Sequence, residues 1–315
     1  MKYISVVSQC YNEEGNVRAI YEEVKKVINS LDGYRYEHIF IDNNSQDKTR
    51  EILREMARED KNVKVIFNAR NFGQIRSPLH GMMQAGGDAV ISIVSDLQEP
   101  PAMIADFVKN WEKGYKVVIG IKNQSEESQI FYAIRTAYYN MVSRLSEIEL
   151  AKNFTGFGLY DREVIEAIRS LNDPYPYFRG LICDLGFKRM ELPYVQPKRR
   201  RGITKNNFYI LYDYAMLGIT SHSKVPLRLA TMFGFLFAVL SLLIAFCYLI
   251  YKLIFWQSFS LGVAPIVVGL FFFISMELFF LGIIGEYVGA IHTQVLKRPL
   301  VIESERINFD PSDKR

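Results

Sequence analysis

Cysteine is scarce in this chain of 315 residues, which has three cysteines, at positions 10, 183 and 247, and no CxxC pair. Neither a disulfide framework nor a thiolate zinc site is therefore expected. The four histidines lack the spacing of metal ligands and give no reason to expect a histidine metal site. No GxGxxG or GxxxxGK[ST] pattern occurs, which excludes the usual dinucleotide-binding and P-loop signatures.

A strong excess of charge of one sign is also missing. The 38 Lys and Arg against 34 Asp and Glu give a net charge of +4, and so small an excess does not suggest a nucleic-acid partner. The first apolar run, Ile4–Val7, is short and is soon followed by polar residues, which is typical of a strand rather than of a signal peptide. We therefore expect the first domain to remain in the cytosol.

Long apolar runs are present in the second half only. Leu229–Phe255 and Phe259–Ile284 are nearly uncharged, and as helices each exceeds the roughly 30 Å of a bilayer core. The three residues between the runs predict an antiparallel hairpin. Basic residues flank both outer ends, at positions 224, 228, 297 and 298, so the positive-inside rule places both ends in the cytoplasm.

These patterns predict four parts. They are a cytosolic domain over 1–206, an amphipathic helix at the membrane interface over 207–227, two transmembrane helices over 228–290 and a cytoplasmic tail over 291–315. The alternative for residues 207–227 is a helix that packs under the soluble domain and does not lie at the membrane interface. The polar tail from Glu303 onward is expected to be mobile.

Short β-branched runs alternate with helical patterns in the first domain. The runs Ile4–Val7, His38–Ile41, Val63–Phe67 and Ala89–Val94 read as strands and predict a doubly wound α/β sheet. Ligands of such sheets bind beyond the carboxyl ends of the strands. Acidic turns follow three of these strands. Each turn alone is a common cap, but three on one edge indicate a ligand site.

The ordered motifs resemble a known family. S-V-V-S-Q-C-Y-N-E-E, I-D-N-N-S-Q-D-K-T, N-F-G, A-G-G-D and S-D-L-Q-E-P-P together resemble glycosyltransferase family 2 with its Rossmann-like GT-A fold. Downstream, P-Y-F-R-G-L, L-P-Y, G-I-T-K, L-G-I-T-S and P-L-R-L are similar to the polyprenyl-phosphate glycosyltransferases. That group includes dolichyl-phosphate mannose synthases and bactoprenol glucosyltransferases. The resemblance extends from about Tyr3 to Arg298.

Site residues follow from the resemblance, position by position. It assigns nucleotide binding to Tyr11, Glu13, Asp42 and Asn44, a divalent metal (Mg²⁺ or Mn²⁺) to Asp96 and Gln98, the acceptor phosphate to Arg135, Arg200, Arg201 and Lys205, and catalytic roles to Asp96, Lys205 and Asp161. The basic stretch around Lys205 also suits attraction to anionic lipid headgroups. Arg135 is the weaker phosphate candidate, because an arginine on the solvent-exposed face of a helix is common.

The chain departs from the family at three positions. Val94 replaces the first carboxylate of Asp-x-Asp, and Gly156 and Gly158 replace the acid and the arginine of Gly-Asp-Phe-Arg-Leu. The acid is a candidate general base in some relatives. Asp161 lies nearby but fits a helix cap equally well. A lipid monophosphate has a second pKa of about 6 and is already largely anionic at neutral pH, so the transfer does not require a base.

The resemblance implies inverting transfer of glucose or another hexose from a nucleoside-diphosphate sugar, with UDP ahead of GDP, to undecaprenyl phosphate. The expected place is the cytoplasmic face of the bacterial inner membrane, in envelope glycan modification such as that of O-antigen. A homotetramer is expected. Three alternatives stay open: a catalytically weak or inactive paralogue acting as a scaffold, a sugar-lipid transporter, and transfer to another lipid such as diacylglycerol.

Overall fold

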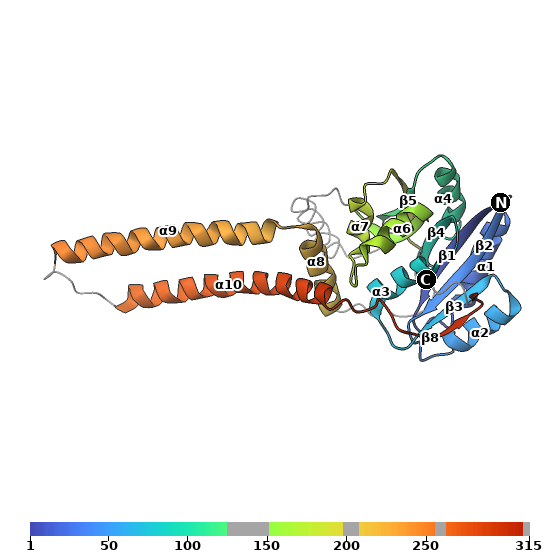
Figure 1. Ribbon diagram of the computed structural model, residues 1–315, viewed down its shortest axis with the longest axis horizontal. Coiled ribbons are helices and arrows are strands. Elements are labelled where there is room, and N and C mark those ends of the chain that lie inside the picture. The colour runs from blue at the N-terminus through green and yellow to red at the C-terminus, as the bar shows by residue number, and fades with distance from the viewer. Residues whose placement is uncertain (125–150, 198–207, 256–262, 311–315) are drawn as a thin grey trace.

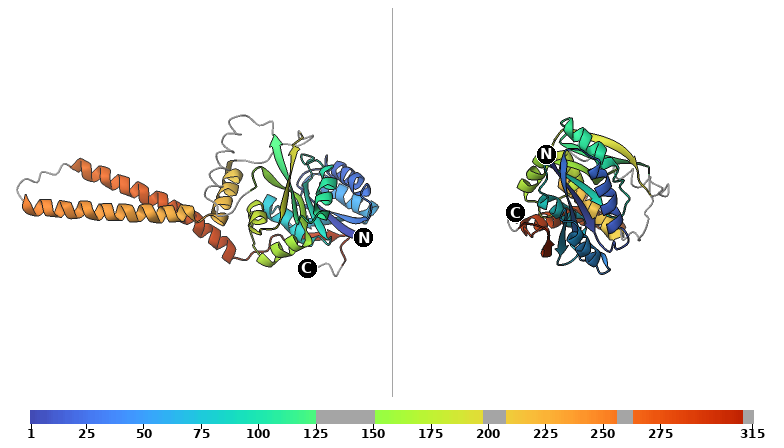
Figure 2. Two further views of the ribbon diagram at one scale, coloured as in Figure 1. Left: turned by 90° about the horizontal axis from the view of Figure 1, so that it is seen from above. Right: turned by 90° about the vertical axis from the view of Figure 1, so that its right-hand side faces the viewer.

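The computed structural model describes residues 1–124, 151–197, 208–255 and 263–310 (Figure 1). An α/β domain forms one end, and two long helices project from it side by side (Figures 1 and 2). The described residues form an eight-stranded sheet of order β7-β5-β6-β4-β1-β2-β3-β8. Its strands are β1 (Lys2–Cys10), β2 (Tyr34–Asp42), β3 (Val63–Asn68), β4 (Ala89–Val94), β5 (Val117–Gln124), β6 (Phe154–Asp161), β7 (Arg189–Val195) and β8 (Glu303–Ile307).

Four neighbouring strands of the sheet, β4, β1, β2 and β3, run parallel. Their carboxyl ends therefore lie along one edge, where doubly wound sheets bind their ligands. β6 is antiparallel to β4 and β5, β7 is parallel to β5, and β8 is antiparallel to β3. The predicted α/β class is confirmed, and the sheet is mixed because β6 and β8 run antiparallel to the strands beside them.

Helices cover both faces of the sheet, because successive residues of a strand point to opposite sides. Val6 packs into the cluster formed with α1, α2 and α4, whereas its neighbour Val7 packs into the cluster formed with α3, α6 and α7. The bounds of these helices are α1 (Val17–Asn29), α2 (Thr49–Glu59), α3 (Gly73–Gln84), α4 (Met103–Glu112), α6 (Arg162–Leu171) and α7 (Phe178–Asp184).

The apolar half forms the predicted helical hairpin. Helices α9 (Val225–Ile254) and α10 (Val263–Val295) lie side by side in both side views (Figures 1 and 2). Within them, Val225–Ile244 and Gly269–Val295 are long and apolar enough to cross a membrane. Pro226 stands in the first turn of α9, where its missing N–H costs no helical hydrogen bond.

Helix α8 (Phe208–His222) connects the two parts of the molecule. The Tyr212 hydroxyl donates to Glu286 on α10 at 2.8 Å, and the Tyr177 ring from the α/β domain packs edge-on against His222. Helix α8 lies within the range 207–227, for which an amphipathic helix at the membrane interface is expected, and that position stays a prediction.

The tail after the hairpin is ordered over Glu303–Ile307, contrary to the expectation of a mobile segment. These residues form β8, which pairs antiparallel with β3 at the edge of the sheet. An edge strand needs a backbone partner on one side only and tolerates charged side chains, which is why its polar sequence gave no strand signal. The chain that leaves the α/β domain at α9 therefore returns to the same domain after α10.

Acid is expected to weaken the attachment of β8 through Glu303. Burial raises the pKa of this carboxyl, but hydrogen bonds from His80 and Arg306 outweigh burial and lower the pKa to about 2. Because this value lies below the ordinary 4.5, the stabilisation is complete above pH 4.5 and is lost as the pH falls toward 2. Part of it comes from Arg306 on β8 itself, and the part that attaches β8 to the domain comes from His80 on α3.

We therefore expect Glu303→Gln at pH 7 to lose much of the hydrogen-exchange protection of the β8 amides. Protection factors corrected for intrinsic exchange are the measurement. Equal protection in the variant and the unmodified protein would contradict the assigned role of the Glu303 carboxylate.

Candidate active site

The loops that follow β1, β2 and β4 meet at the carboxyl edge of the sheet. The backbone N–H of Asn12 donates to the Ser45 hydroxyl at 2.8 Å, and the N–H of Gln46 donates to the Asn12 side-chain oxygen at 2.8 Å. On the other side of β1, the Ser95 hydroxyl donates to the backbone oxygen of Gln9 at 2.7 Å. The three acidic turns expected to share one site are thus in one place.

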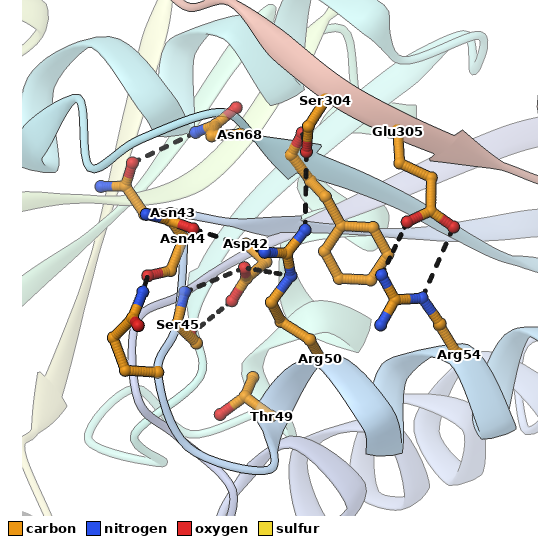
Figure 3. Close-up of polar contacts among 12 residues, drawn as sticks. Asp42, Asn43, Asn44, Ser45, Thr49, Arg50, Arg54, Asn68, Ser304 and Glu305 are labelled. Atoms are coloured by element: carbon orange, nitrogen blue, oxygen red, sulfur yellow. Dashed lines mark hydrogen bonds and ion pairs between the residues drawn. The ribbon is translucent and has the colours of Figure 1, made fainter.

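Asp42 ends β2 and lies wholly buried beneath this edge (Figure 3). Its carboxylate accepts hydrogen bonds from the backbone N–H and the hydroxyl of Ser45, and Arg50 lies 3.7 Å away. Burial raises the pKa of Asp42, while the Ser45 bonds and Arg50 act in the opposite direction. These contacts fix the carboxylate at the end of the strand, where the resemblance placed a nucleotide ligand.

The other expected nucleotide ligands lie in the same two loops. Asn44 follows Asp42 with a φ of 64°, and its side-chain oxygen accepts from Arg50 at 3.3 Å. Tyr11 and Glu13 follow β1 and are both half-buried. The Glu13 carboxylate accepts from the Asn16 amide at 2.6 Å. The structure therefore brings together all four residues assigned to the nucleotide, with two of them on each loop.

Asp96 and Gln98 lie in the β4–α4 loop, on either side of a strained residue. Leu97 has a φ of 60°, a left-handed conformation that costs a bulky residue about 1–3 kcal/mol and is found mainly at functional sites. The Asp96 carboxylate is 8% exposed and accepts from the Gln98 N–H at 3.1 Å. The turn at Leu97 thus holds the two expected metal ligands next to each other.

The oxygen set of this loop suits a hard divalent cation. Mg²⁺ is usually held by one or two carboxylates together with substrate phosphates and water, and does not need a cage of protein ligands. Asp96 with Gln98 fits that mode. No group of three or more His, Cys, Asp or Glu side chains able to hold a metal occurs among the described residues, so a cation at this edge would depend on the diphosphate for further ligands.

Glu99, in the same loop, is a buried acid that was not assigned a role from the sequence. Its two carboxylate oxygens accept from the Val94 N–H and from the Thr155 hydroxyl, each at 2.9 Å. Burial raises the pKa of Glu99 to about 7. The signal was the acid in S-D-L-Q-E-P-P, but only the fold shows that it joins the β4–α4 loop to β6.

A pocket runs from the sheet edge to α8. Glu99 and Thr155 line it on the sheet side, Arg179 and Tyr177 come from the start of α7, and Tyr214 comes from α8. The charge of Arg179 acts on Glu99 and on Tyr214, lowering the pKa of each against the larger effect of burial. Sequence reasoning used P-Y-F-R-G-L only for the resemblance and overlooked Arg179, because the pocket joins segments far apart in the chain.

The residues assigned to the acceptor phosphate, Arg135, Arg200, Arg201 and Lys205, lie outside the described residues. Asp161 is described and lies away from the others. It pairs with Ala89, the first residue of β4, and so stands at the opposite edge of the sheet from Asp96. It is the N-cap of α6, and Trp111 donates to its carboxylate at 2.7 Å. These contacts favour the helix-cap alternative over the catalytic role.

We expect Asp161→Ala to lower stability by about 1–3 kcal/mol and to leave catalysis within twofold. The change removes the cap of α6 and leaves the buried Trp111 N–H without its acceptor. Melting temperature and turnover per folded molecule are the two measurements. A tenfold loss of turnover at an unchanged melting temperature would restore Asp161 to the catalytic candidates.

Comparison with known proteins agrees with this geometry. The chain is 34% identical over 300 residues to an uncharacterized glycosyltransferase, YkcC, of Bacillus subtilis (strain 168), covering 95% of this chain and 92% of that protein. It is 31% identical over 300 residues to the bactoprenol glucosyl transferase of Shigella phage SfII, covering 95% and 96%. The model of the family described as Glycosyl transferase family 2 matches residues 5–169. With loops after β1, β2 and β4 that carry the family's acidic residues, the chain belongs to glycosyl transferase family 2.

Proposed function

We propose that this glycosyltransferase moves glucose or another hexose from a nucleoside-diphosphate sugar, with UDP as the favoured carrier, to undecaprenyl phosphate. The transfer would take place at the cytoplasmic face of the bacterial inner membrane, with inversion at the anomeric carbon. The observation that carries the proposal is the pocket lined by Glu99, Arg179 and Tyr214, which joins the donor edge of the sheet to the helix beside the apolar hairpin.

The two substrates have different physical requirements, and the fold meets both. A nucleotide sugar is soluble and polar, which suits the edge formed by Asp42 and Asp96. A polyprenyl phosphate has its tail in lipid, so its headgroup must reach the same edge from the membrane side. The hairpin and α8 lie on that side of the α/β domain (Figure 2). Relatives called bactoprenol glucosyl transferases support this acceptor.

In the proposed reaction, a phosphate oxygen of the acceptor forms a bond to the anomeric carbon. The bond from that carbon to the donor's diphosphate oxygen breaks, and its electron pair leaves with the nucleoside diphosphate. A divalent cation held by Asp96 and Gln98 would supply charge neutralisation for the leaving group. The chain's own part is to position both substrates, with Asp42 and Asn44 on the nucleotide and Arg179 on the acceptor phosphate.

The proposal is tested by incubating detergent-purified protein with undecaprenyl phosphate, Mg²⁺ or Mn²⁺, and a panel of UDP-, GDP- and dTDP-sugars. Release of nucleoside diphosphate and the mass of the lipid product are measured. We expect one donor to give a lipid phosphate enlarged by one hexose, and EDTA to abolish the product. Absence of turnover with every donor, in an assay where the phage SfII relative is active, would overturn the proposal.

A further inference from the structure

The strand that follows the membrane hairpin lies against the helix that supports the nucleotide loop. β8 pairs with β3 in a register that places Glu305 opposite Phe67. The Ser304 hydroxyl donates to the backbone oxygen of Phe67 at 3.0 Å, and the N–H of Ala69 donates to the oxygen of Ile302 at 2.8 Å. These bonds set the side chains of Ser304 and Glu305 beside α2.

Two arginines of α2 meet these side chains. Arg50 and Arg54 are one turn apart, and their guanidinium carbons lie 4.8 Å and 4.6 Å from the centre of the buried Phe67 ring. Arg54 forms an ion pair with Glu305 at 2.7 Å, and Arg50 donates to the Ser304 hydroxyl at 3.5 Å (Figure 3). Stacking on Phe67 and the two contacts from β8 restrict both side chains to one position each.

Arg50 also contacts two residues at the carboxyl edge of the sheet, where the donor is proposed to bind. One side of its guanidinium faces the Asp42 carboxylate at 3.7 Å and the Asn44 side-chain oxygen at 3.3 Å (Figure 3). Asn44 has a left-handed backbone conformation, which asparagine tolerates, and its side-chain oxygen is held by the hydrogen bond from Arg50. Ser304 thus contacts Arg50 directly, whereas Glu305 contacts Arg54, which stacks on the same Phe67 ring as Arg50.

We propose that Ser304 and Glu305 are positioning residues of the donor site, and that the segment after the membrane hairpin completes the nucleotide-binding loop. This inference rests on the proposed function, because it takes Asp42 and Asn44 as nucleotide ligands. Neither Ser304 nor Glu305 touches the substrate. Ser304 acts on Arg50 directly, and Glu305 acts through Arg54 and the Phe67 ring on which both arginines stack, so that Arg50 keeps its position against Asp42 and Asn44. Donor affinity then depends on β8, while acceptor affinity does not.

Three variants of the full-length protein test the inference, namely Ser304→Ala, Glu305→Gln and the double change. The matched control is Glu59→Gln, which removes an ion pair from Arg18 to the same helix at the exposed surface. Binding of UDP, GDP and dTDP is measured by calorimetry without acceptor, and KM for donor and acceptor is measured separately. We expect the double variant to bind the preferred nucleotide about tenfold more weakly, with acceptor KM unchanged and the control equal to the unmodified protein.

A second comparison separates positioning from folding. The charge-swapped pair Arg54→Glu with Glu305→Arg should recover at least half of the affinity lost by Glu305→Gln, and Ser304→Ala, which removes a single hydroxyl, should still weaken binding two- to threefold. Equal nucleotide affinity in the double variant and the unmodified protein would overturn the inference, as would equal losses for donor and acceptor. If the unmodified protein binds none of UDP, GDP and dTDP, the proposed function itself fails.

Discussion

Asp96→Asn is expected to lower kcat/KM by on the order of 10²–10³-fold while the protein stays folded. The asparagine keeps the shape of the side chain and can still accept the Gln98 N–H, so the turn at Leu97 is preserved. What it removes is the negative charge that would hold a divalent cation on the departing diphosphate. Loss of a single preorganised electrostatic contact to a leaving group has an effect of about this size.

The measurement is donor turnover at saturating acceptor, across a range of Mg²⁺ and Mn²⁺ concentrations. Asp106→Asn, an exposed residue on the nearby helix α4, is the matched control and should leave activity unchanged. A variant at position 96 that keeps more than a tenth of the activity at every metal concentration would rule out the assigned role of Asp96.

The grouping of polar residues at the carboxyl edge of the sheet was predictable from the sequence, because local patterns determine which residues follow each strand. Runs such as Ala89–Val94 indicate strands through β-branched composition, and polar residues directly after a strand must lie at its carboxyl end. Parallel pairing of β4, β1 and β2 then brings Asp96, Tyr11 and Asp42 to one edge. No contact between distant side chains had to be known for this step.

The supporting parts of the site were not predictable in the same way. β8 pairs with a strand more than 230 residues earlier, and its charged residues are stabilised by Arg54 and His80, whose positions depend on the finished fold. The pocket beside Arg179 likewise joins β4, β6, α7 and α8. Such features are set by tertiary contacts, which periodicity and turn residues do not report.

For Asp161, nearness in the sequence was misleading. Its proximity in sequence to the missing family acid at Gly156 suggested a catalytic role. However, β6 runs antiparallel to β4, so five residues along the strand carry Asp161 to the far edge of the sheet. A strand advances by about 3.3 Å per residue, so residues several positions apart on one strand lie far apart in space. The sequence alone does not give the direction of β6, so it does not show at which edge of the sheet Asp161 lies.

Restoring the family's arginine with Gly158→Arg is expected to destabilise the protein by at least about 3 kcal/mol. A Cβ at this position would lie 2.6 Å from the backbone oxygen of Val118 and 3.1 Å from the Cα of Ile119. Both atoms belong to β5, which pairs with β6 at Gly158, and neither can move without opening the ladder. The glycine therefore reflects how closely β5 and β6 pack in this chain.

Melting in detergent is the measurement, with a fall of about 10 °C expected for Gly158→Arg and a smaller fall for Gly158→Ala. Ala102→Arg adds the same side chain at an exposed position before α4 and should melt like the unmodified protein. A Gly158→Arg protein that melts within about 2 °C of the unmodified protein would show that β5 and β6 can separate. The expected result would mean that the family's arginine has no room at this position, so that its absence is a consequence of the local fold and is no sign of lost activity.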